Sequence, residues 1–287
     1  MLPDALSLGA THLTVSDLDG SIAFYERSLG LGVHDRDDCT ARLGAGAEDL
    51  IVLTGVSGAA LGGRHAGLFH FALLLDSREE LARAITRLAE SGTRIEGASD
   101  HGVSESIYLR DPDDNGIELY ADRPRGQWPP PRHPGERVDM YTIALDMSDL
   151  LQTVADEPPP GRAGPGMRTG HVHLHVADVE RALVFYRDVL GFEVMASLPS
   201  AAFVAAGGYH HHLGLNTWLG TDVRPRPPRT AGLREWTVHL PGPADVDAVC
   251  ARVETAGLAA SQREGGFAVD DPWKATVAIV VDPRRAA

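Results

Sequence analysis

The sequence has little cysteine, no long apolar run and a deficit of basic residues, and each shortage excludes a class of protein. Its only cysteines are Cys39 and Cys250, too few for a disulfide framework or a cysteine-ligated zinc site. No stretch approaches the roughly 18 consecutive apolar residues of a membrane-spanning helix. The first residues lack the basic and then apolar pattern of a signal peptide. We therefore expect a cytoplasmic protein without membrane contact.

The charge balance is acidic, because 26 Lys and Arg residues face 40 Asp and Glu residues and leave a formal net charge of −14. Phosphate backbones bind concentrated positive charge, so nucleic acid is not an expected partner. The hydrophobic content of 43% is enough for packed cores, and the 287 residues suggest two domains. The sequence is rich in histidine, with 13 residues, and histidine is a frequent metal ligand and general base.

The chain repeats itself with an offset of 161 residues, which is the separation of His12 from His173. The same offset relates Tyr25 to Tyr186, and a Leu-Gly pair follows each tyrosine. Two further pairs of segments match between the halves, namely Gly67-Leu68 with Gly232-Leu233 and Asp111-Pro112 with Asp271-Pro272. The chain is therefore duplicated, and we expect its two halves to share one architecture.

Within each half the same structural unit occurs twice. A short strand leads into a helix with apolar residues at helical spacing, such as Ile22, Tyr25 and Leu29. Short alternating strands then follow, as in residues 105–110. These patterns predict an α+β fold made of four βαβββ modules, paired two per domain within each half of the chain.

The predicted domains are residues 1–123 and residues 169–287, joined by a linker at residues 124–168. Proline is concentrated at two places in this linker, residues 129–131 and 158–160. Between them, residues 140–151 form an apolar patch that predicts a strand and a short helix. We therefore expect a structured linker and no third domain.

Three side chains of the first half have the chemistry of a metal site. His12, His70 and Glu118 come from three different predicted strands. Two imidazoles and one carboxylate form the facial triad that binds Fe(II) on one face of an octahedron and leaves three positions free. Each residue alone is better explained as a satisfied core or rim side chain. Their equivalent places in the repeated modules together predict a metal site.

Several motifs of the sequence resemble those of the vicinal oxygen chelate superfamily, which includes glyoxalases, bleomycin resistance proteins and extradiol dioxygenases. The motifs are His-Leu-x-Val-x-Asp, Phe-Tyr and Leu-Gly in residues 12–30, Gly-Leu-Phe-His-Phe-Ala in residues 67–72, and Asp-Pro-Asp-x-Asn-Gly-Ile-Glu in residues 111–118. Residues 99–105 and 209–218 further resemble the two-domain catechol 2,3-dioxygenase-like group. The resemblance spans nearly the whole chain. It implies cup-shaped mixed sheets and iron ligands at His12, His70 and Glu118.

One position bears on the reaction class. A glyoxalase-type relative would carry a fourth ligand, a glutamate, on the last strand of the first module. Val52 is the residue that aligns there. Three ligands with an apolar neighbour leave room for two substrate oxygens and O₂, whereas four ligands suit an isomerase.

The second half departs from the ligand pattern. His173 corresponds to His12, but Glu235 and Ala278 stand where His70 and Glu118 would be, so we do not expect this half to hold iron. Its histidines could form a second metal site, or they could hydrogen-bond inside a cup that has lost its ligands. The cluster consists of His171, His173, His175, His210, His211 and His212. We favour a structural or lid-like half that shapes the first active site or a dimer contact.

Two residues of the first half are catalytic candidates, because a catechol must lose protons as it chelates a metal. Tyr108 shares its strand face with Ser106 and Arg110, and a tyrosine occupies that place in the resembling dioxygenases. Tyr108 is equally well explained as a tyrosine at the edge of the core. His101 lies in a polar turn just upstream, where a titrating imidazole could reach the substrate.

The sequence therefore predicts an Fe(II)-dependent extradiol dioxygenase whose partners are a small aromatic diol and O₂. Mn(II) is a second candidate metal, since oxygen and imidazole ligands accept both ions. Two alternatives stay open, a glyoxalase-like lyase or isomerase with another divalent metal, and a metal-free protein that binds a small aromatic molecule. The duplicated sheet edges also suggest a homodimer.

Overall fold

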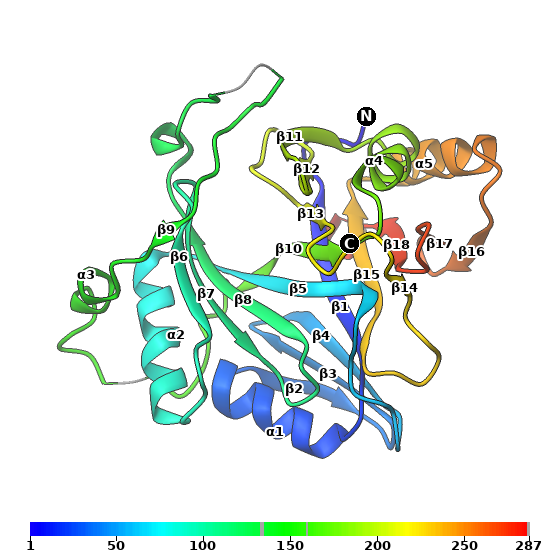
Figure 1. The fold of residues 1–287 in the computed structure, drawn as a ribbon. Coiled ribbons are helices and arrows are strands. Elements are labelled where there is room, and N and C mark those ends of the chain that lie inside the picture. The colour runs from blue at the N-terminus through cyan, green and yellow to red at the C-terminus, as the bar shows by residue number, and fades with distance from the viewer. Residues whose placement is uncertain (133–134, 159, 286–287) are drawn as a thin grey trace.

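Each of the four predicted modules folds as one strand, a helical segment and three further strands (Figure 1). The computed structural model describes residues 1–132, 135–158 and 160–285. The first two modules comprise β1 (Ser7–Val15), α1 (Leu18–Leu29), β2 (Gly32–Arg36), β3 (Thr40–Ala45) and β4 (Glu48–Gly55), then β5 (His65–Leu75), α2 (Arg78–Glu90), β6 (Gly97–Asp100), β7 (Ser104–Arg110) and β8 (Gly116–Asp122). The predicted α+β fold of βαβββ modules is confirmed.

The last two modules repeat this order. They comprise β10 (Arg168–His175), α4 (Val179–Leu183) continued by the π-helix η2 (Val184–Leu190), β11 (Glu193–Leu198), β12 (Ala201–Ala205) and β13 (Leu213–Asn216), then β15 (Gly232–Leu240), α5 (Pro243–Thr255), β16 (Ala260–Arg263), β17 (Gly266–Asp270) and β18 (Thr276–Val281). The short strand β14 (Arg224–Pro225) lies between these two modules along the chain, and η3 (Pro283–Arg285) follows β18.

The repeated Asp and Leu-Gly motifs mark the two ends of the first helix of each half. Asp17 and Asp178 are the N-caps, and each side chain accepts a hydrogen bond from the backbone amide three residues further along. Gly30 and Gly191 follow the last helical residue with φ of 72° and 98°, in the left-handed region that glycine enters without strain. The repeat in the sequence is therefore a repeat of helix ends.

The modules pair across the two halves of the chain, which differs from the expected pairing within each half. β1 runs antiparallel to β15 and joins the first and fourth modules in an eight-stranded sheet. β5 runs antiparallel to β10 and joins the second and third modules in a ten-stranded sheet. Each sheet is mixed and curls into a cup (Figure 1). In every module the same edge of the first strand is free to pair with another module. The repeat alone therefore does not predict which first strands pair.

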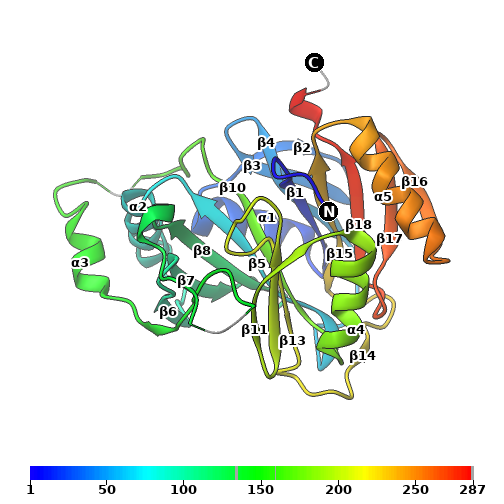
Figure 2. The same ribbon diagram turned by 90° about the horizontal axis from the view of Figure 1, so that it is seen from above.

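The linker packs against the second module. It contains η1 (Arg125–Gln127), β9 (Ile143–Ala144) and α3 (Met147–Gln152), which confirms the strand and short helix predicted in residues 140–151. β9 pairs with β6, and α3 lies beside α2 at the end of the molecule opposite α4 and α5 (Figure 2). Residues 133–134 and 159 of the predicted linker, and residues 286–287 of the predicted C-terminal domain, lie outside the described residues. The domain boundaries stay a prediction.

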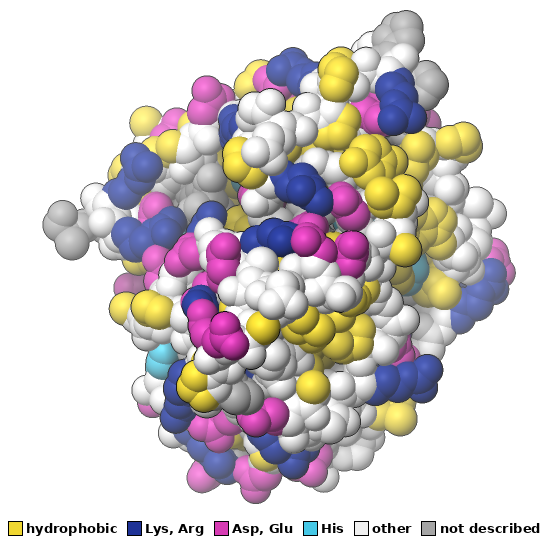
Figure 3. Space-filling view, turned by 90° about the vertical axis from the view of Figure 1, so that its left-hand side faces the viewer, with side chains coloured by type: hydrophobic (Ala, Val, Ile, Leu, Met, Phe, Trp, Pro, Cys, Tyr) yellow, Lys and Arg dark blue, Asp and Glu magenta, His cyan; other side chains and the backbone are white. Residues whose placement is uncertain are grey.

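Ion pairs connect the linker to α2 on the outer face of the molecule. Arg78 contacts Asp149 at 2.7 Å, and Arg83 contacts Glu157 at 2.6 Å. Basic and acidic side chains are intermixed over this face (Figure 3). Because these pairs are partly exposed, each adds little stability, and their effect is to fix where the linker lies. Among the described residues, no helix has the length and apolar composition needed to cross a membrane.

Two buried tyrosines connect the modules that belong to the same half. Tyr25 in α1 donates its hydroxyl hydrogen to Asp111 at 2.8 Å, and Tyr186 in η2 donates to Asp271 at 3.0 Å. Both aspartates open the repeated Asp-Pro turn and also accept backbone amides of that turn. Burial raises the pKa of Asp111, and it raises the pKa of Asp271 to about 6. Each half is therefore held together by a helix-to-turn bond, although its sheets pair with the other half.

The substitutions Tyr25→Phe and Tyr186→Phe test this connection. We expect each to lower the free energy of unfolding by about 1–3 kcal/mol, because a buried carboxylate loses a hydrogen bond that water cannot replace. Urea denaturation followed by circular dichroism measures the change. Two variants as stable as the parent protein would contradict the assignment.

Candidate active site

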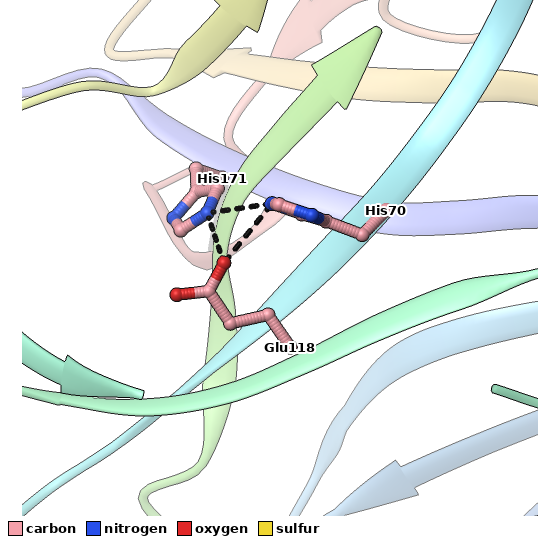
Figure 4. Close-up of side chains that lie close together, drawn as sticks. All are labelled: His70, Glu118 and His171. Atoms are coloured by element: carbon pink, nitrogen blue, oxygen red, sulfur yellow. Dashed lines mark hydrogen bonds and ion pairs between the residues drawn. The ribbon is translucent and has the colours of Figure 1, made fainter. Parts of the chain in front are cut away.

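Three side chains from neighbouring strands meet on one face of the ten-stranded sheet (Figure 4). His70 comes from β5, Glu118 from β8 and His171 from β10, and β5 lies between the other two strands. Ala72 is the cross-strand neighbour of both Glu118 and His171. Because the methyl group of Ala72 is short, the two longer side chains converge above it with His70, which lies two residues back on the same face.

The donor atoms of this group are spaced like the ligands of a divalent metal. The Nε2 atoms of His70 and His171 are each 3.0 Å from Glu118 Oε2 and 3.3 Å from each other. An octahedral ion with bonds of about 2.1 Å holds adjacent ligands about 3.0 Å apart. The three atoms therefore fit one triangular face of an octahedron, and the nitrogen and oxygen donors suit Fe(II) and its neighbours in the first transition series.

The protonation states of the group also suit a cation. Burial disfavours ionisation of Glu118, but His171 and His70 beside it hold the pKa of this carboxyl well below its ordinary value. Burial lowers the pKa of His171 to about 4, against the opposing effect of Glu118. A metal binds an ionised carboxylate and neutral imidazoles, so these two side chains are ready to act as ligands near neutral pH.

The structure does not bring His12 to this group, which corrects the predicted convergence of His12 with His70 and Glu118. His12 lies on β1 in the eight-stranded sheet, next to Val52 and opposite Glu235. Burial lowers the pKa of His12, and the charge of Glu235 opposes this effect. The cause of the error is the crossed pairing of the modules, which places the first module against the fourth.

Val52 lies in the eight-stranded sheet beside His12, so its identity does not bear on a fourth ligand for this group. The strand that flanks β10 is β13, with the sequence Leu-Gly-Leu-Asn, and it carries no acidic residue.

Sequence reasoning missed His171 as a partner of His70 and Glu118. At the offset of 161 residues, His12 matches His173, and the residue that matches His171 is Ala10. The repeat therefore drew attention to a histidine of the first module that has no role in this group. The available signal was the alternation of His171 and His173 along β10, which gives both side chains the same face of the sheet.

A cavity of about 330 Å³ lies over the three donor atoms. Its walls come from both halves and from the linker, which contributes residues 140–142. Much of the lining is apolar or aromatic, namely Phe69, Val103, Met140, Leu198, Phe203 and Trp218. All lining residues belong to the described part of the chain, and among them there is no Lys or Arg and no carboxylate other than Glu118. The volume and lining suit a single aromatic ring.

The two predicted catalytic residues lie together in this cavity, although their roles stay a prediction. Tyr108 is the cross-strand neighbour of Glu118, and its hydroxyl lies 2.7 Å from His101 Nε2. His101 Nδ1 lies 3.0 Å from the carbonyl oxygen of Tyr141. Because a carbonyl only accepts, His101 Nδ1 donates to Tyr141, and in this Nδ1–H tautomer Nε2 accepts from Tyr108. Burial and the charge of Glu118 raise the pKa of Tyr108 well above its ordinary value.

Two further histidines of the second half line the cavity. His173 is buried, and its Nε2 atom has no hydrogen-bond partner. The His211 ring lies against the His171 ring, tilted by 46° and with 4.1 Å between centroids. Burial lowers the pKa of His173 and of His211 well below the ordinary value, so both rings are neutral near pH 7. The second half is therefore more than a lid, because it supplies one member of the candidate metal-binding group and part of the cavity wall.

The histidine cluster of the second half builds no separate metal site in the described part of the chain. There, His70, Glu118 and His171 are the one group of at least three possible ligands whose donor atoms lie within 4.8 Å of one another. Of the other clustered histidines, His173 and His211 line the same cavity. The remaining three have hydrogen-bond partners of their own: His175 contacts Asn216, His212 accepts from the backbone amide of Ala206, and His210 contacts His211 and Asp122.

Comparison with known proteins places the chain in a family. The model of the Glyoxalase/Bleomycin resistance protein/Dioxygenase superfamily matches residues 7–119 and 168–283. Catechol-2,3-dioxygenase of Bacillus subtilis (strain 168) is 44% identical over 270 residues, which cover 92% of this chain and 93% of that protein.

Solved structures share the fold at low sequence identity. A putative dioxygenase of Bacillus subtilis has a TM-score of 0.63 at 13% identity and covers 96% of this chain and 85% of its own. Glyoxalase I of Zea mays has a TM-score of 0.57 at 19% identity and covers 96% and 93%. The family model spans both halves and the bacterial relative spans most of the chain. This chain therefore belongs to the Glyoxalase/Bleomycin resistance protein/Dioxygenase superfamily, as a catechol-2,3-dioxygenase-like enzyme.

Proposed function

We propose that this protein is an Fe(II)-dependent extradiol dioxygenase that opens the ring of a catechol with O₂. The observation that carries the proposal is the convergence of His70, Glu118 and His171 beside a cavity of the size of an aromatic ring. The relative named catechol-2,3-dioxygenase, at 44% identity, supports this reaction class. In the reaction, the carbon–carbon bond next to the diol breaks and both atoms of O₂ enter the product, a semialdehyde or keto acid.

His70, Glu118 and His171 would hold the metal. Bound iron supplies a centre that chelates the vicinal oxygens of the diol and relays electrons from it to O₂. The chain contributes the spacing of the three donors and their protonation states. It also contributes a mostly apolar cavity, in which the diol is oriented and water is largely displaced.

Tyr108 and His101 are proposed to move a substrate proton. The Tyr108 hydroxyl already donates to His101 Nε2 at 2.7 Å, so Tyr108 Oη can receive a hydrogen from the diol as its own passes to His101. The carbonyl of Tyr141 accepts from His101 Nδ1 and stabilises the charged ring that results. The two residues thus act as one base, in which His101 holds the proton.

The lining further indicates the class of ring substituent. The residues that surround the cavity include no Lys or Arg, and Glu118 is already engaged with two histidines. A carboxylate on the ring would be desolvated without a partner, which is costly in an apolar cavity. We therefore propose catechol and its alkyl- or halogen-substituted derivatives as substrates, in preference to carboxylated catechols.

Metal analysis of single variants tests the ligand set. In protein purified without chelators and loaded with Fe(II), we expect His171→Ala and Glu118→Ala to weaken iron binding by about 100-fold or more, because a ligand is lost. His12→Ala, in the other sheet, is the matched control and should bind iron like the parent protein. A loss of iron in His12→Ala equal to that in His171→Ala would refute this ligand set.

Ring cleavage is tested by mixing the Fe(II)-loaded protein with catechol under anaerobic conditions and then admitting air. We expect a yellow ring-fission product only after air enters. We also expect kcat/KM to be about 100-fold higher for 4-methylcatechol than for 3,4-dihydroxybenzoate. This ratio corresponds to a cost of about 3 kcal/mol for burying the unpaired carboxylate of the second substrate. Turnover of any substrate without O₂ would favour a lyase or isomerase instead.

The roles of His101 and Tyr108 are tested by His101→Gln and Tyr108→Phe. Each should lower kcat by about 10²–10⁴-fold and leave the iron content unchanged, because proton transfer is lost and the ligands are not. Tyr25→Phe, which weakens the fold far from the cavity, is the control and should retain kcat. If both variants turn over catechol at the parent rate, the proton-transfer role is wrong.

A further inference from the structure

A chain of hydrogen bonds leads away from the cavity through the second half. His211 lines the cavity, and its Nδ1 atom lies 2.8 Å from Nδ1 of His210. His210 Nε2 in turn lies 2.9 Å from Asp122 Oδ1. The His210 side chain is completely buried, whereas that of Asp122 is 26% exposed. These hydrogen bonds thus connect the imidazole of His211 in the cavity with the partly exposed carboxylate of Asp122.

Two tyrosines hold Asp122 in this position. Tyr209 donates its hydroxyl hydrogen to Asp122 Oδ2 at 3.0 Å, and its oxygen lies 2.7 Å from the Tyr120 hydroxyl, which therefore donates to it. The ring of Tyr209 lies against that of His210, tilted by 35° and with 4.0 Å between centroids. Asp122 also lies on β8, the strand of Glu118, at the same face of the sheet. The carboxylate therefore has a fixed orientation relative to the metal-binding group.

The hydrogens of this chain follow from its chemistry. A carboxylate only accepts, so His210 Nε2 carries a hydrogen and donates it to Asp122. In the Nε2–H tautomer of His210, Nδ1 carries a lone pair. The contact of 2.8 Å between the two Nδ1 atoms needs one hydrogen, which therefore belongs to His211. The Nε2 atom of His211 is then an acceptor.

We propose that Asp122 and His210 are positioning residues that hold His211 as its Nδ1–H tautomer, so that His211 Nε2 accepts a hydrogen from the bound diol. The tautomer assignment does not depend on the proposed function, whereas the contact with the diol rests on it. A diol has two hydroxyl groups, and the cavity then offers an acceptor for each, His211 on one and the Tyr108–His101 pair on the other. With the opposite tautomer, an N–H group of His211 would face a hydroxyl hydrogen.

Nuclear magnetic resonance of the full chain labelled with ¹⁵N-histidine tests the tautomer directly. Long-range proton–nitrogen spectra distinguish Nδ1–H from Nε2–H rings, and His210→Gln and His211→Gln assign the signals. The sample is loaded with Zn²⁺, a diamagnetic ion, and is measured near pH 7. We expect His210 as Nε2–H and His211 as Nδ1–H. A doubly protonated His210, or His211 as Nε2–H, would overturn the proposal.

Asp122→Ala and Asp122→Asn test the cause of the tautomer. Alanine leaves His210 Nε2 without its acceptor, and an asparagine amide can donate to that atom, so we expect both variants to populate the Nε2–H tautomer of His211. Tyr25→Phe is the matched control, because it removes a buried hydrogen bond between a tyrosine and a carboxylate, Asp111, that is not part of this network. His211 should remain Nδ1–H in this control. A His211 that stays Nδ1–H in both Asp122 variants would show that Asp122 has no positioning role.

Steady-state kinetics with Fe(II) and catechol then separate the two parts of the proposal. We expect Asp122→Ala to lower kcat/KM by about tenfold or more and the control Tyr25→Phe to change it by less than about threefold. A shifted tautomer with unchanged kcat/KM would refute the contact between His211 and the diol and leave the tautomer assignment intact. A parent protein with no activity toward any catechol would refute the proposed function, and the spectra would still decide on the tautomer.

Discussion

The antiparallel pairing of β5 with β10 is the interaction on which the rest of the site depends. It sets His171 beside Ala72 and brings two modules that lie far apart in the sequence into one sheet. β8 joins the other edge of β5 in parallel and carries Glu118 to the same alanine. A sheet fixes side chains to within fractions of an ångström, because each register position and face follows from the backbone hydrogen bonds. Three donors about 3 Å apart are therefore a property of strand register, and no loop has to place them.

Burial acts in two opposite ways in this cavity. It lowers the pKa of His171 and His211 and so keeps imidazoles neutral, as a ligand and an acceptor must be. It also opposes ionisation of Glu118, which stays charged because two histidines face it. The same low polarity that prepares these groups makes any additional charge expensive. The proposed metal binding and the proposed preference for uncharged rings thus have one physical origin.

Local patterns in the sequence were enough to predict the modules, whereas the pairing of modules depends on contacts between residues far apart in the sequence. Apolar spacing and the capping residues Asp17 and Gly30 are read within one turn of chain, so helices, strands and the repeat could be predicted. His70, Glu118, His101 and Tyr108 all belong to the second module, and their proximity follows from that module alone. His171 could not be found in the same way, because the edge of β5 accepts the first strand of any module equally well. Only long-range packing selects β10.

The crossed arrangement of the modules also governs what happens when the polypeptide is divided. Residues 1–123 contain β1 and β5, and both partner strands lie beyond residue 167. A fragment of either half made alone would present two unpaired strand edges, which are templates for aggregation. A backbone nick in the connecting segment of the intact molecule would leave every interstrand ladder in place, so the two pieces stay bound as one particle. The two halves of this duplicated chain thus share one architecture, and each needs the other to complete both of its sheets.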